Sequence, residues 1–118
     1  MHELAIADSI VAVACDHANG RRVAKVEVVV GALRQVVPSA LEFAFELVAA
    51  GTPLEGAELV LEHVAARVRC RNCFGESVCA GFPLACGRCQ SDHVDVIAGE
   101  ELHVDTLELD EPVPVGRR

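Results

Sequence analysis

Residues 70–89 read CRNCFGESVCAGFPLACGRC and contain five of the six cysteines of the chain. Two Cys-x-x-Cys pairs, Cys70 with Cys73 and Cys86 with Cys89, are separated by twelve residues. Two residues between paired cysteines let both sulfurs turn to one side of a bend. Two such bends that face each other form a tetrahedral cage of four sulfurs, which is the donor set of a structural zinc site.

Zinc is favoured over two alternatives for this cage. Iron in a rubredoxin-like cage would use the same four thiolates, and disulfides would pair them, but disulfides are rare in a reducing compartment. A catalytic zinc keeps an open coordination position, whereas four thiolates close the site. We therefore expect a structural Zn²⁺. Cys79, which lies between the pairs, is interpreted as a spare thiol, and Cys15 as a core residue.

The rest of the chain alternates between helical and extended patterns. The apolar periodicity predicts a helix over 4–18, a strand over 21–33, a helix over 37–51, and strands over 57–69, 94–99 and 100–111. This order predicts an α+β fold in which two helices pack on a three-stranded mixed sheet, with an inserted four-cysteine zinc-ribbon-like domain. We expect an α/β domain over 1–68 plus 95–110, a zinc-binding insert over 69–94, and a flexible tail over 111–118.

Particular residues support the two predicted helices. Ile6, Ile10 and Val13 form the predicted buried face of the first helix, and Asn19-Gly20 is a suitable end for it. In the second helix, Pro38 suits the first turn and Gly51 the C-terminal stop. Its predicted buried stripe consists of Leu41, Phe45 and Val48. The cysteine-rich segment has too few apolar residues for a core of its own, so it needs a metal to hold it together.

Composition excludes several classes of protein. The chain has 10 Lys and Arg residues against 18 Asp and Glu, a formal net charge of −8, and no Trp or Tyr. Nucleic-acid binding needs cationic groups to neutralise phosphates and aromatic rings to stack on bases, so we expect no nucleic-acid partner. No apolar run reaches the length of a membrane span, and the N-terminus lacks the features of a signal peptide. We expect a cytoplasmic protein.

The first three residues, Met1-His2-Glu3, form a compact donor set. The α-amine of Met1, the amide nitrogen of His2 and its imidazole can chelate one ion together, and the amide or carboxylate of Glu3 or a water can complete a plane that suits Ni²⁺ or Cu²⁺. The positive end of the predicted helix favours the neutral, ligating amine. On chemistry alone, the favoured interpretation of the same residues is a solvent-exposed histidine and a glutamate that complements the helix dipole.

Several segments in their order resemble one family. They are MHELAIADSIV at the start, then GAL and VVPSALEFAFELV, then GTPLEGAELVLEHV and ARVRC, followed by the paired cysteine knuckles. Together they are similar to the HypA/HybF family, the nickel metallochaperones of NiFe-hydrogenase maturation. The resemblance covers residues 1 to about 109.

The resemblance implies a function and a set of ligands. It implies delivery of nickel to the hydrogenase large subunit together with a nickel-handling GTPase, and in some organisms to urease. It implies a transient nickel site at the Met1 amine, His2 and Glu3, and no catalytic activity. The implied zinc ligands are Cys70, Cys73, Cys86 and Cys89.

The other histidines and a rival function complete the expectations. His93, four residues after Cys89, is a candidate additional nickel ligand. His63 and His103 lie on predicted strands and are interpreted as structural or solvated, whereas His17 near the end of the first helix suits the helix dipole. The rival to nickel delivery is a zinc-stapled protein-interaction adaptor with no nickel site of its own. A homodimer is compatible with either function.

Overall fold

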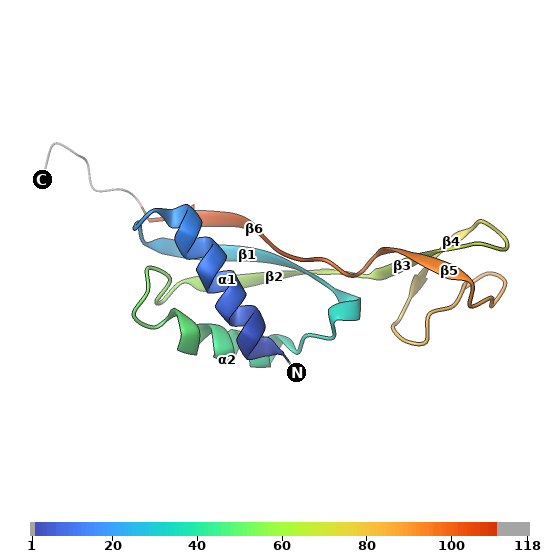
Figure 1. Ribbon diagram of the computed structural model, residues 1–118, viewed down its shortest axis with the longest axis horizontal. Coiled ribbons are helices and arrows are strands. Elements are labelled where there is room, and N and C mark those ends of the chain that lie inside the picture. The colour runs from blue at the N-terminus through green and yellow to red at the C-terminus, as the bar shows by residue number, and fades with distance from the viewer. Residues whose placement is uncertain (1, 111–118) are drawn as a thin grey trace, which may run out of the picture. The chain divides into compact units, whose positions relative to one another are not determined.

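The computed structural model describes residues 2–110 of the 118, so the Met1 amine and the predicted tail over 111–118 lie outside the described residues. Figure 1 shows the order of the elements along the chain. They are α1 (Glu3–Ala18), β1 (Val23–Gly31), the short 3-10 helix η1 (Ala32–Arg34), α2 (Pro38–Ala49), β2 (Glu58–Val64), β3 (Ala66–Cys70), β4 (Glu76–Cys79), β5 (Val94–Ala98) and β6 (Leu102–Leu109).

The chain divides into two compact units. The first contains the described residues up to Val28, then Val37–Leu61, then those from Val104 onward; the second contains Val29–Val36 and Glu62–His103. The second unit extends further than the predicted insert over 69–94. The reason is that β3 pairs with β5, with Arg67 opposite Ala98 and Cys70 opposite Val94. Both strands therefore belong to the unit that carries the cysteines.

Helix α1 buries a narrow face of small residues. Its buried residues include Ala7, Ile10, Val11 and Ala14, at the spacing of one helix face, and this face allows α1 to contact α2. The predicted burial of Val13 is wrong, because its side chain is 43% exposed. The helix ends as predicted: Asn19 and Gly20 adopt left-handed backbone conformations, with φ of 53° and 81°.

Helix α2 begins at Pro38, as the sequence predicts, since proline needs no hydrogen-bond partner in the first turn. Leu41 and Phe45 are buried and confirm most of the predicted stripe, but Val48 is half-buried and Ala44 takes its place in the core. The opposite face is apolar and exposed at Phe43 (64%). Among residues 2–110, neither helix is both long and apolar enough to cross a membrane.

The predicted three-stranded mixed sheet is present in the order β2-β1-β6. The chain path in Figure 1 shows β1 and β2 running in the same direction and β6 in the opposite one. The central strand β1 alternates over Lys25–Val28: Val26 and Val28 are fully buried, whereas Lys25 and Glu27 are half-buried and form an ion pair of 3.6 Å. The alternation ends at Val29, which is buried like Val28 and Val30. The valine-rich face of this strand therefore belongs to the core of the first unit.

A second sheet, in the order β4-β3-β5, was not predicted. Both pairings are antiparallel, and β3 is the centre. The single strand expected over 57–69 is interrupted at Ala65, so that β2 and β3 belong to different sheets. In β3 the side chains alternate between buried and exposed, with Ala66, Val68 and Cys70 buried.

Two glycines let backbones approach closely in the second unit. A Cβ atom added to Gly31 would lie 2.1 Å from the carbonyl carbon of Gly99, and one added to Gly99 would lie 2.7 Å from the Cα atom of Ala66. The amide of Gly31 donates to the carbonyl of Glu101 (2.7 Å), and that of Leu33 donates to Gly99 (2.8 Å). Only a residue without a side chain fits between these hydrogen-bonded backbones.

We therefore expect Gly31→Ala to lower the free energy of unfolding by at least about 2 kcal/mol, because the backbones on both sides must move apart. The backbone of Gly31 is ordinary (φ −79°), so the cost is steric. Gly20→Ala is the matched control: Gly20 has a φ of 81° and nothing within 4 Å, so this change should cost only about 1 kcal/mol of strain. Urea unfolding measures both, and equal costs would contradict the interpretation.

Candidate metal centre

Four cysteine sulfurs converge in the second unit. The Sγ atoms of Cys70, Cys73, Cys86 and Cys89 all lie within 4.8 Å of one another. The distances between Cys70 and Cys89 and between Cys73 and Cys86 are both 3.6 Å. Cys70 ends β3 and Cys73 follows in the next turn, whereas Cys86 and Cys89 lie between β4 and β5. The sulfurs that the sequence pattern predicts to meet therefore do meet.

The two knuckles have the same hydrogen bonds. In the first, the amides of Asn72 and Cys73 donate to the sulfur of Cys70 at 3.3 and 3.4 Å. In the second, the amides of Arg88 and Cys89 donate to the sulfur of Cys86 at the same two distances. The first cysteine of each pair is buried and the second is exposed. The N–H groups of each knuckle thus favour the thiolate form of the sulfur to which they donate.

Each knuckle closes through a residue with positive φ. Phe74 follows Cys73 with a φ of 63°, and Gln90 follows Cys89 with a φ of 69°. Gly87, inside the second knuckle, is not among the residues with positive φ. Gly87 instead leaves room for Ser77, whose hydroxyl accepts a hydrogen bond from the Gly87 amide at 2.9 Å.

The thiol pKa values follow from these contacts. The amides of Cys89 and Arg88 lower the pKa of Cys86 to about 6. The amide of Cys73 is also the main group that lowers the pKa of Cys70. At Cys89 the backbone of Ser91 lowers the pKa, but the neighbouring sulfur of Cys70 and burial outweigh it and raise the pKa to about 11. The neighbouring sulfurs disfavour deprotonation of the Cys89 thiol, and a bound divalent cation would favour it.

The cluster fits a tetrahedral metal ion. With Zn–S bonds of about 2.3 Å, sulfurs at the corners of a tetrahedron are about 3.8 Å apart. The two measured separations of 3.6 Å are close to this value, and at that distance the cysteines are not joined as disulfides. The donor set, the spacing and the N–H groups around the buried sulfurs therefore all suit a bound cation.

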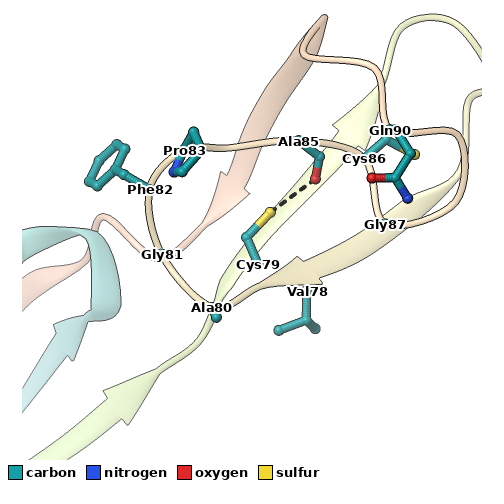
Figure 2. Close-up of a pocket in the computed structure, with 10 residues that line it drawn as sticks. All are labelled: Val78, Cys79, Ala80, Gly81, Phe82, Pro83, Ala85, Cys86, Gly87 and Gln90. Carbon is teal, nitrogen blue, oxygen red and sulfur yellow. Dashed lines mark hydrogen bonds between the residues drawn. The ribbon is translucent and has the colours of Figure 1, made fainter.

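Cys79 and Cys15 lie outside the cluster. Figure 2 shows the thiol of Cys79 turned toward the carbonyl of Ala85, to which it donates a hydrogen bond of 3.3 Å. Cys79 and Cys86 both line a cavity of about 360 Å³ beside the Phe82–Pro83 loop. The sequence predicts Cys15 to be a core residue, but on α1 in the first unit it is only half-buried.

The second predicted metal site lies at the start of α1. His2 is exposed and occupies the N-cap position, with no side-chain capping hydrogen bond. Its carbonyl accepts the first helical hydrogen bond, from the amide of Ile6 at 2.9 Å.

Glu3 makes a hydrogen bond that the sequence does not predict. The residue is only 8% exposed, and its Oε2 atom accepts a hydrogen bond of 3.0 Å from the amide of Val37, which is the N-cap residue of α2. The α-amine of the chain and then the amide of Val37 lower the pKa of the Glu3 carboxyl to about 2. The carboxylate therefore joins the beginnings of the two helices. The sequence does not predict this role, because Glu3 and Val37 are remote from each other along the chain and meet only in the folded structure.

The remaining histidines are exposed. The Nδ1 atom of His17 donates to the carbonyl of Val13 (2.9 Å) in the last turn of α1, as its predicted position suggests. His63 on β2 and His103 on β6 are exposed, which fits solvated residues. His93 belongs to the second unit, with its Nε2 atom 3.6 Å from an oxygen of Asp92. Its role as an additional nickel ligand stays a prediction.

The fold and the four-sulfur cluster define a small α+β protein built to hold a metal ion. The family described as "Hydrogenase/urease nickel incorporation, metallochaperone, hypA" matches residues 1–109, and the chain belongs to this family. The predicted class, a hydrogenase maturation metallochaperone rather than an enzyme, is thereby confirmed.

Related proteins cover nearly the whole chain. The hydrogenase maturation factor HypA of Geotalea uraniireducens is 43% identical over 110 residues, which are 93% of this chain and all of that protein. The HypA of a Nostoc species is 37% identical over 94% of this chain and 97% of its own length. The solution structure of the nickel metallochaperone HypA from Helicobacter pylori has the same fold, with a TM-score of 0.67 at 24% identity over 92% of this chain and 97% of that one.

Removal of one clustered sulfur should abolish metal binding. We expect Cys73→Ala to reduce zinc content from about one ion per chain to nearly none, because a three-thiolate site lacks the closed tetrahedral geometry. Cys79→Ser and Cys15→Ala are matched controls that should keep full zinc content, since both thiols lie outside the cluster. Metal analysis of the purified variants is the measurement. Loss of zinc from the Cys79 variant would show that the ligand set is wrong.

Glu3 should make stability depend on pH in the acid range. Because its pKa of about 2 is below the ordinary 4.5, the carboxylate stabilises the folded state above about pH 4.5, and this contribution disappears as the pH falls toward 2. Glu3→Gln should therefore be less stable than the native protein at neutral pH, and the difference should shrink in acid. Urea unfolding followed by circular dichroism measures it. Glu42→Gln, at an exposed position of α2, is the control; a pH-independent difference would contradict the assignment.

Proposed function

We propose that the chain is a nickel metallochaperone whose four clustered cysteines hold a structural Zn²⁺ and whose N-terminus carries Ni²⁺ as transient cargo. Convergence of the four sulfurs within 4.8 Å is the observation that supports the zinc site most strongly. Zinc suits it because the site is closed and needs no redox chemistry. When bound, the ion would neutralise the crowded thiolates and hold the two knuckles together.

We propose that the nickel donors are the Met1 amine and the amide and imidazole of His2, with Glu3 completing the site. Two observations support this assignment. The family is one of nickel incorporation, and His2 is exposed at the helix start without a side-chain capping bond. An exposed terminus suits cargo, because the metal must leave again.

Glu3 has a second role in this proposal. Its Oε2 atom is engaged by Val37, so the carboxylate fixes the first turn of α1 against the start of α2. A fixed first turn lowers the entropy that the terminal donors lose when they close around an ion. The fourth donor is then the amide of Glu3, its carboxylate or a water.

The implied partners follow from hydrogenase maturation. We propose that the protein acts in the cytoplasm with the maturation GTPase that handles nickel and with the hydrogenase large subunit that receives it. Urease is the alternative recipient, as the family description includes both enzymes. The rival proposal, a zinc-stapled adaptor without nickel, would keep the cysteine cluster and the partners but would have no nickel site at the terminus.

Nickel titration of the zinc-loaded protein separates the two proposals. We expect His2→Ala to weaken nickel binding by at least about tenfold, roughly 1.4 kcal/mol, because one chelating donor is lost. Acetylation of the α-amine should have the same effect, since an amide nitrogen at that position no longer offers a basic lone pair. His63→Ala, which removes an exposed histidine from β2, is the matched control.

Each outcome has a definite meaning. Tight nickel binding that is lost in both the His2 and the acetylated forms, but kept by the His63 variant, supports delivery from the terminus. Binding that is equal in all forms would place the nickel site elsewhere. Absence of nickel binding in the native protein together with full zinc content would favour the adaptor.

A further inference from the structure

The exposed face of the second sheet carries three arginines at alternate positions. Arg67 and Arg69 lie on β3 and Arg71 follows it by one residue, while Val68 and Cys70 between them are buried. Alternate residues of a strand share one face. The three side chains are 45%, 60% and 68% exposed. We call this surface, with the residues of β4 and β5 beside it, the arginine face.

The arginine face has more guanidinium groups than carboxylates. Arg71 binds Asp95 of β5 through two nitrogens, at 2.6 to 3.1 Å. Arg67 donates to one oxygen of Glu76 on β4 at 3.0 Å, and Arg69 is 3.7 Å from the other oxygen of the same group. Three cations therefore share two anions among the described residues.

Arg69 is the least satisfied of the three. It lies directly opposite Glu76 on one side and Asp95 on the other. Both carboxylates nevertheless make their shorter contacts with another arginine. At 3.7 Å the contact of Arg69 with Glu76 is an ion pair rather than a hydrogen bond. Its planar guanidinium, which suits two-pronged binding of a carboxylate, is thus available to an outside acceptor.

Apolar side chains border the arginines. Val78 of β4 is the direct partner of Arg67 in the register and is 59% exposed. Ile97 of β5 lies at the irregularity between the partners of Arg67 and Val68 and is 46% exposed. Arginine is enriched at protein interfaces, and the exposed apolar side chains beside it can add apolar contact to charge pairing.

The charge of the rest of the chain makes this surface distinctive. Acidic residues exceed basic ones by eight overall, so most of the surface repels an anionic partner. An acidic protein segment would therefore meet attraction at the arginine face and repulsion elsewhere, which specifies a single orientation.

We propose that the arginine face is a docking site for an acidic segment of a partner protein, with Arg69 as the principal carboxylate-binding residue. Glu76 acts as an internal competitor that occupies Arg67 and Arg69 until the partner's carboxylates replace it. This assignment does not depend on nickel binding at the terminus. A nucleic acid is disfavoured by the net charge of −8, since three cations oppose a repulsive background.

Binding of a defined probe tests the assignment. The probe is a fluorescein-labelled peptide of about eight glutamates, and the same peptide with glutamines is the reference. Anisotropy titrations use the full zinc-loaded chain at low and near-physiological salt. We expect Arg69→Gln to weaken binding by about fivefold and Arg69→Lys to weaken it less, because lysine keeps the charge but loses the planar fork.

Two further variants sharpen the test. Arg21→Gln changes the net charge equally at an exposed position of the first unit and should leave binding unchanged. Glu76→Gln should strengthen binding by about threefold, because it removes the internal competitor. Zinc content and circular dichroism confirm that each variant is folded.

Four results would overturn the proposal. Equal weakening by Arg69→Gln and Arg21→Gln would mean that only net charge matters. Weaker binding by Glu76→Gln would mean that this carboxylate supports the surface rather than competing for it. Tighter, Arg69-dependent binding of a single-stranded oligonucleotide would assign the surface to phosphates. Self-association that sedimentation detects and Arg69→Gln abolishes would identify the occupant as a second copy of this chain.

Discussion

Convergence of four sulfurs within 4.8 Å is the constraint on which the second unit depends. The segment between β3 and β5 has few apolar residues to bury, so burial alone cannot order it. Its backbone instead folds into two knuckles whose amides point at Cys70 and Cys86. The amides lower the pKa of the Cys70 and Cys86 thiols, whereas the neighbouring sulfur of Cys70 and burial raise that of Cys89. A bound cation would balance the thiolates, so we expect metal binding to stabilise the fold of this segment.

In the first unit, a buried carboxylate fixes the beginning of α1. Chain ends are normally loose, but here Glu3 is buried and its carboxylate accepts the amide of Val37 at the start of α2. One charged side chain thus ties together two helix beginnings that are remote in sequence. Its position directly after His2 means that the stability of the helix pair and the order of the proposed nickel donors depend on the same residue.

The two units also differ in how they manage charge. Ion pairs on the first sheet, such as that between Lys25 and Glu27, connect neighbours on one surface. On the second sheet, three arginines share two carboxylates, and one cation is left poorly matched. Exposed ion pairs add little stability, so an unbalanced set of this kind is better explained by binding than by folding.

The sequence by itself determined the local features. The Cys-x-x-Cys spacing specified the four sulfurs that meet, the valines of β1 specified a half-buried strand, and Pro38 and Asn19-Gly20 marked helix ends, because each effect acts over only a few residues. Tertiary structure decided the rest. The break at Ala65, the second sheet, the exposure of Val13, the close approach at Gly31 and the bond between Glu3 and Val37 all depend on segments remote in sequence. Periodicity shows which faces are apolar, but only packing determines which of them become buried and which polar groups become neighbours.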